Sequence, residues 1–144
     1  LERRIVLCYT GTSRISGTTI ARVIEGYERG DRRITGAFRA MKDLACGMAE
    51  ALRAADLSGV GALLSQDWHH HQQLDPIMRT DEMARLEAAM AAEGILGGKA
   101  AGSGAGGSMF FLAAGDPDSA RRVAQEAGAQ LLPARWSHEG VASW

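Results

Sequence analysis

The glycine-rich segment between Gly94 and Gly107 constrains the fold more than any other part of the chain. It holds seven of the eighteen glycines, and an uninterrupted apolar run from Met109 to Ala113 follows it. Glycine loses more backbone entropy on folding than other residues, so such a cluster is kept where the backbone adopts positive φ or approaches another group closely. The segment therefore predicts a strand, a glycine turn and a second strand.

The predicted glycine turn also has the features of an anion site. Consecutive backbone N–H groups in such a turn form a concavity suited to phosphate. The spacing is not that of a nucleoside-triphosphate P-loop, because no Gly-Lys-Ser/Thr closes it, nor that of a dinucleotide fingerprint, because the glycines lead into a strand and not a helix. A hairpin without a ligand explains the local sequence equally well, and both interpretations stay open at this point.

Size and charge restrict the class of protein. With 144 residues, 46% of them hydrophobic, the chain is expected to form a single domain over residues 1–144. The net charge of −1 favours neither nucleic acid nor anionic membrane as a partner, and no apolar run is long enough to span a bilayer. Cys8 and Cys46 form no motif, so we interpret them as reduced, buried thiols of a cytoplasmic protein.

The order of secondary-structure elements predicts the fold class. Apolar side chains recur at helical spacing in five stretches, and short β-branched or aromatic runs mark the strands. In chain order we expect a strand at 4–9, helices at 18–28, 38–55, 57–74 and 81–93, the glycine hairpin with its second strand at 109–113, a helix at 117–127 and a last strand at 129–136. This order predicts an α+β, two-layer, ferredoxin-like plait with a mainly antiparallel sheet and an expanded helical layer on one face.

Three successive histidines, His69 to His71, do not predict a metal site. Successive residues on a helix point about 100° apart, so three in a row cannot converge on one ion. We interpret them as part of a solvated helix face, with a hydrogen bond to a substrate as an open alternative. No metal ligand is expected in this chain.

A polar turn, residues 10–17, follows the first strand and contains three hydroxyl side chains between Thr10 and Ser13, then Arg14. Hydroxyls and a guanidinium next to a strand end are suited to a phosphate or a sugar hydroxyl. An ordinary strand-to-helix loop with a capping Ser16 or Thr18 is the simpler local interpretation.

Four stretches in order carry a resemblance to a known family. The run from Tyr9 to Arg14 resembles a strand-end Tyr-Thr-Gly-x-Ser-Arg, and 41–52 is similar to a long helix that follows it. Trp68 lies in the next helix, before a Leu-x-Pro-like sequence at 74–76, and 97–107 resembles a Gly-Ala/Gly-Lys-x-x-Gly-Ala-Gly-Gly-Gly-Gly motif. Together these stretches resemble the C-terminal domain of GHMP superfamily sugar kinases, most closely the heptose 7-phosphate and fucose kinase branch.

Some residues depart from that pattern. Ser103 stands where the family has alanine and Ala105 where it has glycine, and the histidines and glutamines at 69–73 stand where the branch carries lysines. If Ala105 adopts positive φ, the conformation costs roughly 1 kcal/mol or more.

The resemblance implies an ATP-dependent phosphotransferase that acts on a sugar or sugar phosphate. It places a loop beside the transferred phosphoryl group and a second group of residues at the substrate. The loop residues are Lys99, Gly102, Ser103, Gly104, Ala105, Gly106 and Gly107, and the substrate residues are Thr10, Ser13 and Arg14. ATP and Mg²⁺ would be bound mainly by an N-terminal kinase domain that this chain lacks. Because the chain contains neither the family's phosphate loop nor its catalytic aspartate, we expect no catalytic residue in it and no turnover by it alone.

Two alternatives remain at this stage. One is a free-standing, non-catalytic ligand-binding or regulatory α+β module, and the other is a GHMP kinase with a different small-molecule substrate. Self-association of the isolated domain is a further expectation, since a domain that lacks half of its interface exposes apolar surface.

Overall fold

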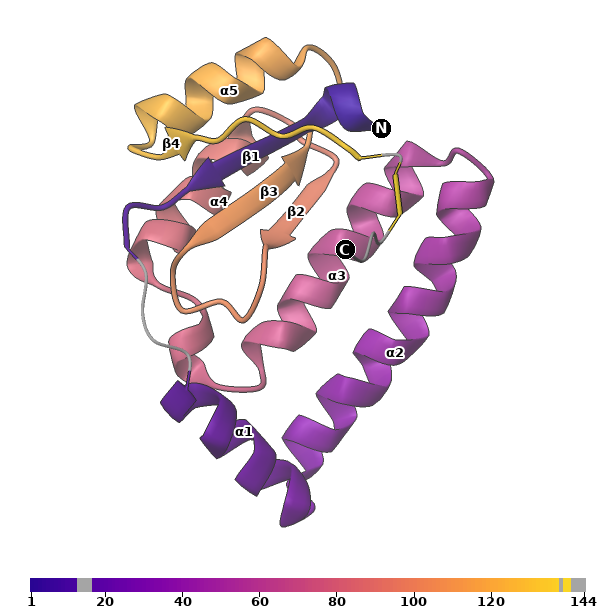
Figure 1. Cartoon of the computed structure of the whole chain (residues 1–144), viewed down its shortest axis with the longest axis vertical. Coiled ribbons are helices and arrows are strands. Elements are labelled where there is room, and N and C mark those ends of the chain that lie inside the picture. Colours follow the sequence, from indigo (N-terminus) through magenta and orange to yellow (C-terminus); the bar gives the residue numbers. More distant parts are fainter. Residues whose placement is uncertain (13–16, 138, 141–144) are drawn as a thin grey trace.

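The computed structural model describes residues 1–12, 17–137, 139 and 140. Four strands form the sheet: β1 (Ile5–Tyr9), β2 (Gly97–Ala100), β3 (Ser108–Leu112) and β4 (Gln130–Leu131). They lie in the order β2-β3-β1-β4, and every neighbouring pair is antiparallel (Figure 1). With a helical insert between β1 and β2 and one helix between β3 and β4, this arrangement is the predicted α+β plait of the ferredoxin type.

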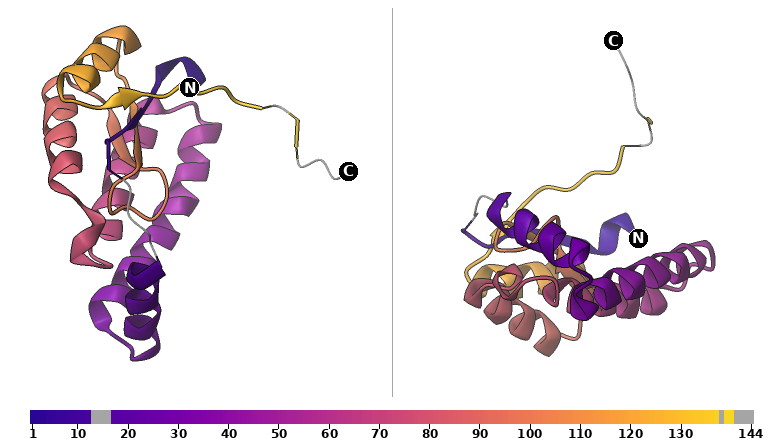
Figure 2. Two further views of the ribbon diagram at one scale, coloured as in Figure 1. Left: turned by 60° about the vertical axis from the view of Figure 1, so that its left-hand side comes forward. Right: turned by 90° about the horizontal axis from the view of Figure 1, so that it is seen from below.

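The helices lie mainly on one side of this sheet. Helices α4 (Asp81–Ala92) and α5 (Pro117–Glu126) cover one face, and α3 (Leu57–Gln72) runs beside β2 (Figures 1 and 2). Helix α2 (Arg32–Arg53) packs against α3. Helix α1 (Gly17–Glu28) lies at the N-terminal end of α2, away from the sheet. Short 3-10 turns, η1 (Glu2–Arg4) and η2 (Pro76–Met78), precede β1 and α4.

Helix α3 approaches β2 closely because both carry glycine at the contact. A Cβ built on Gly97 would lie 1.8 Å from the carbonyl oxygen of Gly61, and one built on Gly61 would lie 2.5 Å from the backbone of Leu96. Any larger residue at either position would push the helix away from the strand. The close approach fixes α3 next to the start of the glycine hairpin.

The main core lies between the sheet and the helices. Alternate side chains of β1 and β3 point to the same face, as the period of a strand requires. Trp68 of α3 is 4% exposed and joins this core, as the helical stripe predicts. The other fully buried side chains in it include Val6, Cys8, Met83, Leu86, Met90, Met109 and Phe111.

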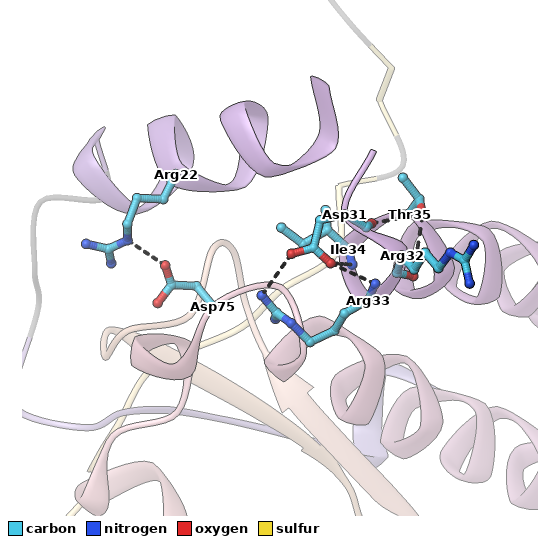
Figure 3. A network of polar contacts seen from close by, with 7 residues as sticks. All are labelled: Arg22, Asp31, Arg32, Arg33, Ile34, Thr35 and Asp75. Atoms are coloured by element: carbon cyan, nitrogen blue, oxygen red, sulfur yellow. Dashed lines mark hydrogen bonds and ion pairs between the residues drawn. The ribbon is translucent and has the colours of Figure 1, made fainter. Parts of the chain in front are cut away.

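Polar contacts tie α1 to η2 and, separately, cap the start of α2 (Figure 3). The Arg22 Nε atom donates to the Asp75 carboxylate at 2.7 Å, and Asp75 also accepts from the N–H of Ile77 at 3.0 Å, capping η2. The hydrogen bond from Arg22 is the main reason that the pKa of Asp75 lies below its usual value. Asp31 caps α2 by accepting from the N–H of Arg33 at 2.8 Å.

Helix boundaries follow the capping residues. Asp56, Thr80 and Asp116 cap α3, α4 and α5 by accepting backbone N–H groups of the first turn, and Pro117 occupies the first turn of α5. Helix α2 begins at Arg32, six residues before the predicted start, because Asp31 caps it.

Two predictions were wrong. The last strand pairs only at Gln130 and Leu131 instead of over 129–136, since Pro133 has no N–H to donate and the chain leaves the sheet after Leu132. Cys46 is exposed on α2, whereas Cys8 is buried as expected, and both thiols are free. Within the described residues, every helix is too short or too polar to cross a lipid bilayer.

Candidate functional site

The glycine loop, residues 101–107, joins β2 to β3 and has an unusual backbone. Its φ angles are +122° at Gly102, +77° at Gly104, +61° at Ala105, +103° at Gly106 and +82° at Gly107. Ala105, which stands where the family motif has glycine, therefore does adopt the left-handed conformation, which costs roughly 1–2 kcal/mol for a residue with a Cβ. Surrounding contacts must hold the loop in this shape.

Two neighbouring segments anchor the loop. The N–H of Ala105 donates to the carbonyl oxygen of Met78 in η2 at 2.7 Å. The N–H of Gly107 donates to the carbonyl oxygen of Thr12 at 2.5 Å. On the β1 side, Thr10 donates to the carbonyl oxygen of Gly107 twice, from its N–H at 2.9 Å and from its Oγ1 at 2.8 Å. The loop is thus held between η2 and the end of β1.

Three other N–H groups of the loop have no acceptor among the described residues. The N–H of Ala101 continues the hairpin ladder by donating to Ser108 at 2.8 Å. Within the described part of the chain, the N–H groups of Gly102, Gly104 and Gly106 form no hydrogen bond. Gly102 is exposed and Gly104 is half-buried. Unpaired N–H groups at alternate positions of a positive-φ turn are suited to an anionic ligand or to water.

A groove of about 380 Å³ adjoins the first residues of the loop. At its polar end Lys99, the last residue but one of β2, forms an ion pair with Asp67 of α3, and both side chains are largely buried. Gly102 forms part of the same wall. The apolar walls come from α2, α3 and β3, and consist of Leu44, Ala45, Met48, Leu63, Leu64 and Phe110.

The predicted substrate residues are only partly described. Thr10 is 8% exposed, and its hydroxyl is used to hold the loop. It lies next to Gly107, so the structure brings the end of β1 and the glycine loop together. Ser13 and Arg14 lie outside the described residues.

The histidine run divides into different environments. His69 is exposed and its Nε2 lies 3.1 Å from Nε2 of Gln73. His71 is 9% exposed and packs edge-on against Trp68, with ring centroids 5.4 Å apart. The interpretation of a solvated face was therefore wrong for His71, which is buried against Trp68. No group of three or more His, Cys, Asp or Glu side chains in the described ranges is placed to hold a metal ion.

Comparison with known proteins decides the family. Residues 48–131 match the family model described as "GHMP kinases C terminal". The chain belongs to the GHMP kinase C-terminal family. It is also 32% identical, over its whole length, to the D-glycero-alpha-D-manno-heptose 7-phosphate kinase of Campylobacter jejuni, and it covers 42% of that protein.

Two further proteins are similar to this GHMP domain. Over 87% of its length it is 28% identical to the bifunctional fucokinase/GDP-fucose pyrophosphorylase of Arabidopsis thaliana, of which it covers 12%. It shares its fold with Streptococcus pneumoniae phosphomevalonate kinase, solved in complex with phosphomevalonate and AMPPNP, at a TM-score of 0.72 and 14% identity over 90% of this chain and 38% of that one. The domain thus spans less than half the length of each of these proteins.

Several residues that lie around the loop of this GHMP domain could not be recognised from the sequence. Asp67 pairs with Lys99, and Met78 supplies the carbonyl that receives the N–H of Ala105. The spacing of Asp67, Trp68 and His71 places them on adjoining faces of one helix, which is the one signal that could have linked them. Met78 acts through its backbone carbonyl, which every residue has, so its residue type could not have indicated this role.

Proposed function

We propose that this chain is the C-terminal lobe of an ATP-dependent GHMP kinase that phosphorylates a sugar or sugar phosphate, with a heptose 7-phosphate as the first candidate. The observation that carries the proposal is the glycine loop, whose N–H groups at Gly102, Gly104 and Gly106 have no acceptor among the described residues. The similarity to a heptose 7-phosphate kinase over the whole chain supports this choice of substrate class.

The loop suits phosphoryl transfer, in which the enzyme mainly positions the phosphate and stabilises its charge. Unpaired N–H groups supply fixed donors that need no reorganisation when charge develops. Lys99 lies two residues before the loop and adds an ammonium group, whose pairing with Asp67 keeps it beside Gly102. Thr10 fixes the loop through Gly107, and Ser13 and Arg14 would contact the sugar or its phosphate.

The remaining parts of the reaction require a second lobe. Phosphoryl transfer also needs a cradle for the triphosphate, a Mg²⁺ site and a group that orients the acceptor hydroxyl. The described residues offer no cluster of three acidic or histidine ligands for the ion. ATP and Mg²⁺ would therefore bind mainly to an N-terminal kinase domain, in a cytoplasmic enzyme, and the 144-residue chain alone would not turn over substrate.

The test is an ATP-consumption assay on the full-length polypeptide that carries this chain, with a panel of sugars and sugar phosphates. We expect turnover with a heptose 7-phosphate or a related sugar, and none from the 144-residue chain. Gly107→Ala should lower kcat/KM without abolishing the fold. The matched control is Gly128→Ala at the end of α5, because both glycines have similar φ, +82° and +88°, and open space at the Cβ position. Turnover by the isolated chain, or equal loss in the two variants, would contradict the proposal.

A further inference from the structure

The turn η2 carries one of the two anchors of the glycine loop, and it is a single turn that cannot hold its own shape. Its one closing hydrogen bond runs from the N–H of Met78 to the carbonyl oxygen of Asp75 at 3.0 Å. The Met78 carbonyl oxygen accepts from the N–H of Ala105 at 2.7 Å, and it would lie 2.6 Å from a Cβ on Gly104. The place of η2 therefore decides where the middle of the loop lies.

The Asp75 carboxylate joins η2 to helix α1. Its Oδ1 atom accepts from the N–H of Ile77 at 3.0 Å and so caps the turn, and its Oδ2 atom accepts from Nε of Arg22 at 2.7 Å (Figure 3). The Asp75 side chain is only 9% exposed, whereas that of Arg22 is 50% exposed. A carboxylate buried to this extent is costly without a charged partner. Arg22 therefore holds the residue that begins η2.

A small apolar cluster attaches the same turn to α1 and α2. Val23, the residue after Arg22, is buried in this cluster with Ile34 of α2 and Met78 of η2. Met78 thus has its side chain in the cluster and its carbonyl oxygen on the loop. Apolar burial is non-directional, so the cluster keeps η2 close to the helices, whereas the hydrogen bonds of Asp75 set the orientation of the turn.

We propose that Arg22 is a positioning residue for the glycine loop: through Asp75 it fixes η2, whose Met78 carbonyl holds the N–H of Ala105. Without the guanidinium, the Asp75 carboxylate turns toward water, η2 loosens and the middle of the loop moves. The end of the loop keeps its place, because Gly107 has its own anchor at the end of β1. The kinetic part of this proposal rests on the proposed kinase function, and the conformational part does not.

The conformational test is native-state hydrogen exchange of the 144-residue chain, followed by NMR for single amides. In Arg22→Gln we expect the protection of the Ala105 amide to fall about tenfold, the order of effect of a lost hydrogen bond to a charged group. The Gly107 amide, which is bonded to Thr12, should keep its protection and serves as the internal reference. The matched control is Arg29→Gln, which removes an exposed ion pair with Glu25 at the end of α1 and should alter neither amide. Unchanged protection of Ala105, or an equal fall at Ala105 and Gly107, would overturn the proposal.

The path through Asp75 is tested by a double-mutant cycle. In the Asp75→Asn background, Arg22→Gln should cause no further loss of protection at Ala105, because the carboxylate on which it acts is already gone. Additive losses would show that Arg22 acts by another route and would overturn the proposal. If Arg22→Gln does not give a folded spectrum, Arg22→Lys takes its place, since lysine keeps the charge without the planar guanidinium. We then expect a loss of about threefold at Ala105, and no loss would overturn the proposal.

The kinetic test uses the full-length kinase. Arg22→Gln should lower kcat about tenfold and leave the KM values for ATP and for the sugar nearly unchanged, because the loop acts on charge that develops at the transferred phosphate. Arg29→Gln should keep the unmutated kcat. An unchanged kcat in Arg22→Gln, or the same loss in Arg29→Gln, would refute the positioning role. An absence of ATP turnover in the unmutated protein would refute the proposed function and leave the exchange result standing.

Discussion

The two ends of the glycine loop give matched substitutions that separate backbone strain from steric contact. Gly106 and Gly107 both have positive φ, but their surroundings differ. A Cβ on Gly106 would lie 2.6 Å from the carbonyl oxygen of Thr12, while a Cβ on Gly107 would meet nothing within 4 Å. Alanine at either position therefore carries the same kind of conformational cost, and only Gly106→Ala adds a clash with a backbone atom.

The magnitudes follow from these contacts. Placing a residue with a Cβ in the left-handed region costs about 1–2 kcal/mol, which is the whole effect expected for Gly107→Ala. Overpacking against a fixed backbone adds about 1–3 kcal/mol, so Gly106→Ala should lose about 2–5 kcal/mol in total. For a chain of this size the corresponding falls in Tm are roughly 5 °C and 10 °C.

Thermal and denaturant unfolding of the 144-residue chain measures both values. Gly102→Ala and Gly104→Ala repeat the comparison at the other end of the loop, because Gly102 is open and a Cβ on Gly104 would lie 2.6 Å from the Met78 carbonyl oxygen. We expect the order of stability Gly107→Ala and Gly102→Ala above Gly106→Ala and Gly104→Ala. Equal losses in all four variants would mean that η2 and the end of β1 do not hold the loop.

Two further predictions concern groups away from the loop. The pKa of Asp75 is lowered in the folded state. The ionised carboxylate therefore stabilises the fold above the unfolded pKa of about 3.9, and this stabilisation is lost as the pH falls through the folded pKa. In urea unfolding at pH 7, Asp75→Asn should lower the free energy of unfolding by about 1–3 kcal/mol. The loss of stability in Asp75→Asn should be smaller at pH 2. The exposed control Asp118→Asn should change neither the stability at pH 7 nor its pH dependence. A loss in Asp75→Asn that is the same at both pH values would contradict the role of the ion pair. For the thiols, burial raises the pKa of Cys8 to about 11 while Cys46 is exposed, so a disulfide reagent at pH 8 should titrate one thiol in the native chain and both in guanidinium. Two fast native thiols would show that Cys8 is accessible.

The sequence predicts the parts of the fold that depend on local pattern. Apolar spacing locates the helices, and the glycine cluster with the apolar run after it locates the β2–β3 hairpin. The motif left open whether Ala105 adopts positive φ, and the structure shows that it does.

The contacts that hold the site are long-range, and residue spacing does not reveal them. The interpretation of His71 as part of a solvated face is wrong because the 3.6-residue period turns its ring toward Trp68. The pairing of Lys99 with Asp67 joins residues 32 positions apart, and Met78 acts through its backbone carbonyl. Cys46 lies next to Ala45 in the sequence but points away from the packed side of α2, and its thiol is exposed.

The most direct test of the account is hydrogen–deuterium exchange on the full-length kinase with and without a non-hydrolysable ATP analogue and the sugar acceptor. The central claim is that the glycine loop, residues 101–107, presents its unpaired N–H groups to a phosphate. It predicts that the ligands slow exchange at Gly102, Gly104 and Gly106, and leave the already bonded N–H of Ala105 nearly unchanged. Ligand binding that protects other parts of the protein and leaves exchange in the loop unaltered would contradict the claim.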